Sequence, residues 1–144
     1  MLKVCTVNSQ NKYKINNYNG IDLKNNDNIL KLYNMLENNN VNIAGTQELT
    51  SRCLKRLKEF CLPKYKIVGK YRLGNNILTN INEINKFNET NSIITTEKII
   101  SYKTKHLYLS GRILSRIVTI AHIETKEDGE LLFLNTHIDY KNIK

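Results

Sequence analysis

115-SRIVTIAHIETKEDGELLFLNTH-137 is the stretch of sequence that decides the fold. Two apolar runs flank the segment TKEDG, whose Asp128-Gly129 pair is typical of the turn between antiparallel strands. Because side chains alternate along a strand, Phe133, Asn135 and His137 share one face of the second run. In the first run, the residues that share a face are Ile117, Thr119, Ala121 and Ile123. The stretch therefore predicts a β-hairpin that holds an imidazole at the end of a sheet.

Two amphipathic helices are predicted before this hairpin. One covers about residues 27–38, where the apolar side chains at helical spacing are Ile29, Leu32, Tyr33 and Leu36. The other covers about residues 51–61, with Thr50 or Ser51 as its N-cap. Its inward side chains are predicted to be Leu54, Leu57 and Cys61. The Asn-rich segment 9–28 is predicted to be a loop.

Short β-branched runs predict the remaining strands. They lie at residues 2–8, 41–46, 65–71, 91–96 and 98–102. The order strand, helix, strand, helix and then several strands is typical of a layered α/β or α+β fold. The length of 144 residues fits a single domain, and 40% hydrophobic residues are enough for a core.

The charge of the chain favours polyanionic partners. The formal net charge is +9, as expected for a protein that binds nucleic acid or phosphate esters. An A/T-rich coding sequence, which would enrich Asn, Lys and Ile, is a competing explanation for part of this charge. The charge by itself is therefore a weak indicator of nucleic-acid binding.

Cysteine usage indicates a reducing compartment, and hydropathy indicates a chain without a membrane span. Cys5, Cys53 and Cys61 are odd in number and form no C-x-x-C pair, which argues against structural zinc and a disulfide framework. The first residues have no apolar stretch behind a basic head, so no signal peptide is predicted. No run approaches the ~18 apolar residues of a membrane span. We expect a cytoplasmic protein without a transmembrane segment.

Polar residues follow several of the predicted strands. The strings are TVN (6–8), GTQE (45–48) and LNTH (134–137), and NETNSI (88–93) places Glu89 just before a strand. Strand ends that meet at one edge of a sheet are where open α/β folds place their sites. One amide, two carboxylates and one imidazole could bind a hard cation and a phosphate, because Mg²⁺ takes oxygen ligands and keeps several waters.

Each of these residues also has a simpler interpretation. His137 on its own is an ordinary strand-end histidine, and Glu48 is an acidic residue in the first turn of helix 51–61, where the helix dipole favours a carboxylate. Glu89 is a solvated charge, and Asn8 begins a loop. The occurrence of all four strings in one chain favours a shared site.

In this order, the strings resemble the endonuclease/exonuclease/phosphatase family, which includes DNase I, exonuclease III and sphingomyelinases. The resemblance rests on LKVCTVN (2–8), VNIAGTQEL (41–49), ETNSIITT (89–96), SRIVTIAHIE (115–124) and LNTHID (134–139). It implies a four-layer α/β sandwich, here with two main helices and mixed, mostly antiparallel sheets. It also implies divalent-metal-dependent hydrolysis of phosphoesters by a nuclease or phosphatase.

The resemblance also implies roles for individual residues. Glu48 would be the ligand of Mg²⁺ or Mn²⁺, and Asn8 would lie beside the metal and the phosphate. His137 would bind the phosphate and stabilise charge in the transition state, with Glu89 as its partner. Three further residues are candidates for binding the phosphate: Asn135, Arg72 and Arg116.

The sequence departs from the family after the N-T-H string. Family members carry a G-D-x-N string and a D-H pair further along, and neither occurs in the 144 residues. We therefore expect residues 1–144 to form a single incomplete domain, the N-terminal half of a catalytic domain. Such a domain would be weak or inactive alone, and its partner would be a complementing C-terminal half or a second copy.

Two other functions remain open. The chain could be a non-catalytic, basic nucleic-acid-binding module, as the charge of +9 and eight tyrosines suggest. It could also be the remnant of a gene, or one half of a split gene that needs a partner chain. For an enzyme, the resemblance is compatible with DNA, RNA, a phosphoinositide or a sphingolipid as substrate.

Overall fold

The computed structural model describes residues 1–8, 26–72, 89–107 and 116–137. In these residues the chain forms two helices and seven strands. Their bounds are β1 (Val4–Asn8), α1 (Asn26–Asn38), β2 (Ile43–Thr50), α2 (Ser51–Cys61), β3 (Lys66–Val68), β4 (Glu89–Thr95), β5 (Lys98–Leu107), β6 (Arg116–Thr125) and β7 (Gly129–Thr136). Among the described residues, no helix is long and apolar enough to cross a membrane.

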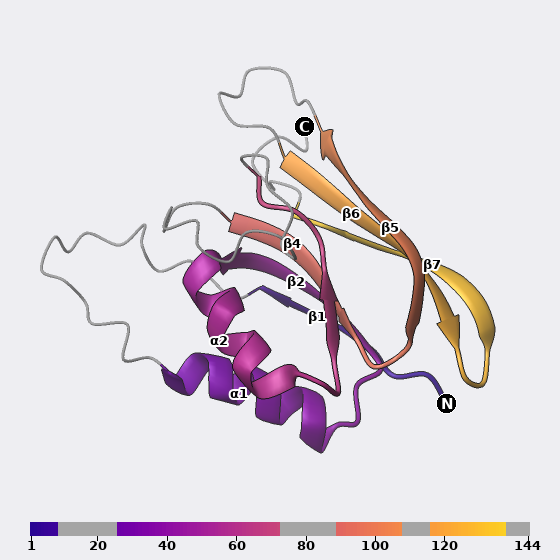
Figure 1. Cartoon of the computed structure of the whole chain (residues 1–144), viewed down its shortest axis with the longest axis horizontal. Coiled ribbons are helices and arrows are strands. Elements are labelled where there is room, and N and C mark those ends of the chain that lie inside the picture. The colour runs from indigo at the N-terminus through magenta and orange to yellow at the C-terminus, as the bar shows by residue number, and fades with distance from the viewer. Residues whose placement is uncertain (9–25, 73–88, 108–115, 138–144) are drawn as a thin grey trace, which may run out of the picture.

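The strands form two sheets that pack face to face. One sheet has four strands in the order β1-β2-β4-β3, and the other has three in the order β5-β6-β7. β1 pairs with β2 in parallel and every other pair is antiparallel. Figure 1 shows α1 and α2 against one face of the four-stranded sheet and the three-stranded sheet on its other side. The predicted α/β architecture with two main helices and mixed, mostly antiparallel sheets is confirmed.

The helices cover the four-stranded sheet with an apolar core. The hydroxyl of Thr50 caps α2 by accepting a hydrogen bond from the backbone N–H of Cys53 at 3.4 Å. The predicted inward residues of α2 are Leu54, Leu57 and Cys61, and all are buried. Burial raises the pKa of the Cys61 thiol to about 12, which keeps it protonated and unreactive.

A second apolar core lies between the sheets. Its buried members are Ile43, Val68, Ile93, Ala121 and Ile123. In the hairpin, Ala121 is paired with Phe133 and Ile123 with Leu131. The predicted hairpin and its inward faces are confirmed, because alternation along both strands places these residues against the opposite sheet.

The end of β2 differs from the prediction. The strand predicted over 41–46 continues to Thr50 through a bulge, where an extra residue falls between Thr46 and Leu49. Glu48 lies in this bulge with a φ of 61°, in the left-handed region that most side chains avoid. Glu48 is therefore a strand residue, and the first turn of α2 contains no acidic residue.

Two other strands also differ in length. β5 was predicted over 98–102 and extends to Leu107, and β4 begins at Glu89 instead of Asn91. The predicted loop 9–28 lies almost wholly outside the described residues, apart from the first turn of α1. On the outer face of the three-stranded sheet, Leu132 and Leu134 are 66% and 59% exposed.

Candidate functional site

Three polar side chains meet where strands from both sheets end. Asn8 is the last residue of β1, Glu48 lies in the β2 bulge, and His137 follows β7. Nδ2 of Asn8 donates a hydrogen bond to Oε1 of Glu48 at 3.4 Å. The same carboxylate oxygen lies 3.5 Å from Nδ1 of His137. The structure thus brings together three of the residues that the sequence predicted for one site.

The bulge explains how Glu48 reaches this position. Gln47 points between the sheets, where it bonds to Asn135, and Leu49 packs in the core under the helices. Strict alternation would place residues 47 and 49 on the same face. Because Glu48 is the extra residue between them, its carboxylate belongs to neither core and projects at the strand end, where it is 14% exposed.

Glu89 and Arg72 form a second pair beside the first. Tyr71 and Thr90 make an isolated bridge, and the backbone N–H of Arg72 donates to the carbonyl of Glu89 at 2.9 Å. Their side chains form an ion pair of 3.8 Å, with 18% of Arg72 and 11% of Glu89 exposed. The carboxylate in contact with His137 is that of Glu48, and Glu89 acts on the imidazole through its charge. The pairing of Glu89 with His137 stays a prediction.

Opposing effects set the pKa of His137. Burial lowers this pKa from its ordinary value of 6.5, and the positive charges of Arg116 and Arg72 lower it further. The carboxylates of Glu48 and Glu89 act in the opposite direction and do not fully compensate. The imidazole is therefore held neutral at neutral pH within a ring of charged groups, as at many sites of proton transfer or anion binding.

Asn135 occupies a different place from the other predicted phosphate-binding residues. It is 4% exposed and lies between the sheets, two residues before His137. Its amide bonds to the backbone and to a side chain of the opposite sheet. Its side-chain partner is Gln47, for which the sequence predicts no role. A glycine at residue 45, inside a predicted strand, was the available signal for a close approach of this kind.

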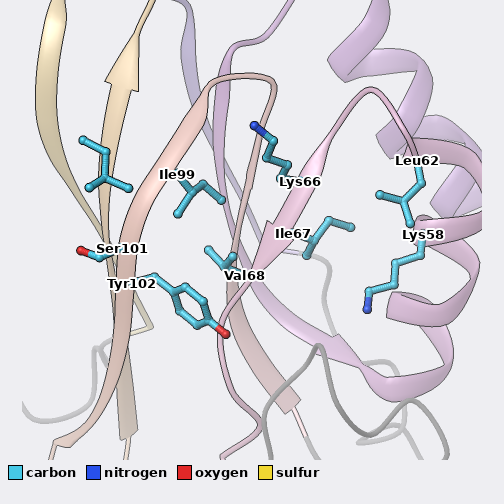
Figure 2. Close-up of a pocket in the computed structure, with 9 residues that line it drawn as sticks. Lys58, Leu62, Lys66, Ile67, Val68, Ile99, Ser101 and Tyr102 are labelled. Carbon is cyan, nitrogen blue, oxygen red and sulfur yellow. The ribbon is translucent and has the colours of Figure 1, made fainter.

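A pocket of about 620 Å³ lies away from these strand ends. Figure 2 shows it between α2, β3 and the beginning of β5. The residues that line it are Lys58, Leu62, Lys66, Ile67, Val68, Ile99, Ile100, Ser101 and Tyr102. None of these carries a carboxylate or an imidazole, so the pocket has no carboxylate–imidazole pair like that of Glu48 and His137. The strand-end site is therefore the better candidate for chemistry.

Solved structures share this fold. The mannosyl-6-phosphatase Bt3783 of Bacteroides thetaiotaomicron VPI-5482 aligns with a TM-score of 0.71 and 24% identity, over 99% of this chain and 54% of its own. An endonuclease/exonuclease/phosphatase family protein from the same species aligns with a TM-score of 0.71 and 25% identity, over 99% and 52%. TDP2 of D. rerio, complexed with a single-stranded DNA product, aligns with a TM-score of 0.61 and 16% identity, over 99% and 48%.

The fold and the strand-end site define a layered α/β sandwich with a carboxylate–imidazole pair at one end. This is the fold of the endonuclease/exonuclease/phosphatase proteins, as the motifs indicated. The chain spans about half the length of the solved structures that it matches, consistent with an N-terminal half. No protein-family model and no curated protein matches the sequence.

Proposed function

We propose that the chain carries half of a divalent-metal-dependent phosphoester hydrolase site. The observation that carries the proposal is the meeting of Asn8, Glu48 and His137 at the ends of three strands of two sheets. Neither the helix dipole nor simple solvation explains this arrangement, because Glu48 lies in a strand bulge with an unfavourable φ. Backbone strain of this kind, which costs about 1–3 kcal/mol, is concentrated at functional sites.

The donor atoms at this site fit Mg²⁺ or Mn²⁺. The carboxylate of Glu48 and the amide of Asn8 supply oxygen, which hard cations prefer. Among the described residues, no group of three or more His, Cys, Asp or Glu forms a complete metal cage. This agrees with a cation that keeps most of its waters and is held by one carboxylate. When bound, the cation would supply Lewis-acid stabilisation of charge on a phosphoryl oxygen.

The imidazole of His137 is suited to bind the phosphate. A carboxylate beside Nδ1 favours the tautomer with its proton on that nitrogen, and Nε2 is then left to face a ligand. A phosphate dianion near the ring would add negative charge and raise the pKa of His137. The ring would then take up a proton and donate a hydrogen bond to a phosphoryl oxygen. Arg116, which already acts on the ring, would add positive charge.

We further propose that the 144 residues alone hydrolyse phosphoesters weakly or not at all. The resemblance implies a base and a second histidine beyond the N-T-H string, and loss of one acid–base group typically costs about 10²–10⁴-fold in rate. The test compares the wild type with Glu48→Gln in Mn²⁺ titrations and in hydrolysis of bis-p-nitrophenyl phosphate. Mn²⁺ binding that is lost in Glu48→Gln supports the site.

Equal Mn²⁺ affinity in both proteins would overturn the metal site. Strong metal-dependent hydrolysis by the wild type, far above that of Glu48→Gln, would overturn the statement that the chain alone is weak or inactive. These two outcomes are independent, because binding is measured without substrate.

The outer face of the three-stranded sheet is a candidate surface for a partner. Leu132 and Leu134 are exposed there, and Ile120 and Val118 extend the apolar surface on the neighbouring strand. Contiguous exposed apolar surface usually marks an interface. Because the solved structures are about twice as long, we propose that a complementing C-terminal half covers this face.

Size-exclusion chromatography with light scattering tests the partner proposal. The chain is measured alone and co-expressed with the coding sequence that follows it. A one-to-one complex that Leu132→Lys weakens supports the complementing half. A stable homodimer of the chain alone, disrupted by the same substitution, would instead assign the face to a second copy. The control is Lys31→Glu, a charge change at an exposed residue of α1 away from this face, which should leave either complex intact.

The substrate is proposed only as a phosphoester. The named neighbours are a mannosyl-6-phosphatase and TDP2 with a DNA product, so the shared fold does not select one class. The charge of +9 favours nucleic acid as the second candidate ligand. Binding of single-stranded nucleic acid should then be measured against salt concentration. Salt-dependent binding that persists in EDTA and in His137→Ala would favour a non-catalytic binding module over the hydrolase.

A further inference from the structure

Asn135 connects the two sheets through its side-chain amide. Its Nδ2 donates hydrogen bonds to the backbone carbonyls of Thr46 and Ser92, each at 2.8 Å. Its Oδ1 accepts a hydrogen bond from Nε2 of Gln47 at 2.6 Å. Asn135 belongs to β7, whereas these partners belong to β2 and β4 of the opposite sheet. The two carbonyls can only accept, which fixes the orientation of the amide.

The space for this side chain exists because residue 45 is a glycine. A Cβ on Gly45 would lie 2.8 Å from Oδ1 and 2.9 Å from Cγ of Asn135, closer than such atoms approach each other. A glycine inside a strand often marks a close approach of this kind. The backbone of β2 and the side chain of Asn135 are thus fitted to each other.

The hydrogen bonds of Asn135 lie close in the chain to both Glu48 and His137. Thr46 and Ser92 form the last regular pair of β2 and β4 before the bulge that contains Glu48. On the other strand, Asn135 lies two residues before His137, which follows the end of β7. No more than two residues therefore separate the connection from either side chain of the pair.

The apolar core cannot provide this alignment alone. Contacts among Ile43, Ile93 and Ala121 hold the sheets together, but hydrophobic burial is non-directional. Hydrogen bonds to fixed carbonyls are directional, and a buried amide tolerates little displacement from its partners. A shift of one sheet along the other would break these bonds before it exposed the core.

We propose that Asn135 is a positioning residue. It holds the ends of β2 and β7 in a fixed alignment across the two sheets, so that Glu48 and His137 face one shared ligand. The proposal concerns the geometry of the strand ends. For its consequence in hydrolysis, it rests on the proposed function. It gives Asn135 a role different from the phosphate-binding role that the resemblance implied.

Backbone hydrogen–deuterium exchange, followed by NMR, tests the proposal without metal or substrate. In Asn135→Ala, amides at residues 46–50 and 133–137 should exchange at least about tenfold faster, because loss of buried hydrogen bonds eases local opening. The remaining parts of both sheets should change much less. If Asn135→Ala does not fold, Gln47→Met removes one bond of the connection at similar side-chain length and takes its place.

Asn42→Ala is the matched control. Asn42 also makes polar connections in the fold, to Glu97 at 2.8 Å and to the backbone N–H of Lys3 at 2.9 Å, but at the other end of β2. It should speed exchange near residues 42 and 97 and leave 46–50 and 133–137 unchanged. Unchanged exchange at these strand ends in Asn135→Ala, or a uniform increase over both sheets, would overturn the positioning role.

Mn²⁺ affinity provides the second readout. Loss of a residue that orients a metal ligand typically weakens metal binding about 10–100-fold, and Asn135→Ala should fall in this range. Faster exchange with unchanged Mn²⁺ affinity would overturn the link between Asn135 and the site. A wild type that binds no Mn²⁺ would count against the proposed function, and the exchange data would still decide the positioning role.

Inorganic phosphate separates the two roles of Asn135. Loss of phosphate binding in Asn135→Ala, with exchange unchanged at the strand ends, would assign the residue to phosphate binding and overturn our proposal. Loss of phosphate binding together with faster exchange at the strand ends supports the positioning role, provided that Asn42→Ala keeps phosphate binding and leaves exchange at 46–50 and 133–137 unchanged.

Discussion

Oε1 of Glu48 and Nδ1 of His137 lie 3.5 Å apart, although the two residues lie at strand ends of different sheets. Burial and the charge of Arg116 lower the pKa of the imidazole, the carboxylate of Glu48 raises it, and the lowering effects prevail. The pair is therefore electrostatically coupled as well as close. Its coupling can be measured in the absence of metal and substrate.

Two substitutions should move the pKa of His137 in opposite directions. Glu48→Gln removes a negative neighbour and should lower this pKa further, whereas Arg116→Gln removes a positive neighbour and should raise it. NMR titration of the ring protons in EDTA measures both, with His137→Gln identifying the signal. Shifts in the same direction for both variants would contradict the described arrangement.

The stability of the protein should depend on pH through His137. Its pKa in the folded state lies below 6.5, so on acidification the unfolded chain binds this proton first. The contribution of the neutral ring is thus complete above pH 6.5 and is lost as the pH falls from there through the lower folded-state pKa. Urea unfolding from about pH 7.5 to about pH 5 should show a steeper loss for the wild type than for His137→Gln. Parallel curves would refute this.

The φ of 61° at Glu48 predicts that glycine at this position is more stable than alanine. Both Glu48→Gly and Glu48→Ala remove the carboxylate, but only glycine adopts this conformation without strain. Glu48→Gly should therefore be more stable than Glu48→Ala by about 1 kcal/mol in chemical unfolding. At Lys103, in the regular strand β5, glycine should instead be the less stable of the same two variants. An alanine variant at 48 as stable as the glycine variant would argue against the bulge.

Two isoleucines provide a test of the core between the sheets. Ile93 is fully buried there, and Ile93→Ala should cost about 2–5 kcal/mol of unfolding free energy. Ile100 is 43% exposed on β5, and Ile100→Ala should cost less than about 1 kcal/mol. Denaturant unfolding compares them directly. Similar losses would mean that the two sheets do not pack as described.

Much of this fold could be predicted from the sequence because its signals are local. The hairpin of β6 and β7 follows from strict alternation and from Asp128-Gly129, and both its faces were predicted. β5 was predicted too short because Lys103 and Lys105 resemble a polar loop. They lie on an edge strand, where outward lysines meet water.

The proximity of three candidate residues was predictable from the sequence, but the local geometry that brings them together was not. Asn8, Glu48 and His137 were found because each follows an apolar run. The bulge at Glu48 was missed, since a left-handed glutamate leaves no pattern in a sequence. The pairing of Arg72 with Glu89 depends on the bridge between Tyr71 and Thr90, which is a long-range contact. Such contacts are set by packing and not by local propensity.

The amide of Asn135 binds the carbonyl groups of residues 46 and 92, and carbonyl groups are present whatever the side chains are. The hydroxyls of Thr46 and Ser92 are hydrogen-bonded to each other at 2.6 Å, and each has one further hydrogen-bond partner. A pair of small apolar residues can therefore replace Thr46 and Ser92 together, while Asn135 keeps its hydrogen bonds to the two backbone carbonyls. In divergent relatives, we expect Asn135 and Gly45 to be retained together even where Thr46 and Ser92 have been substituted.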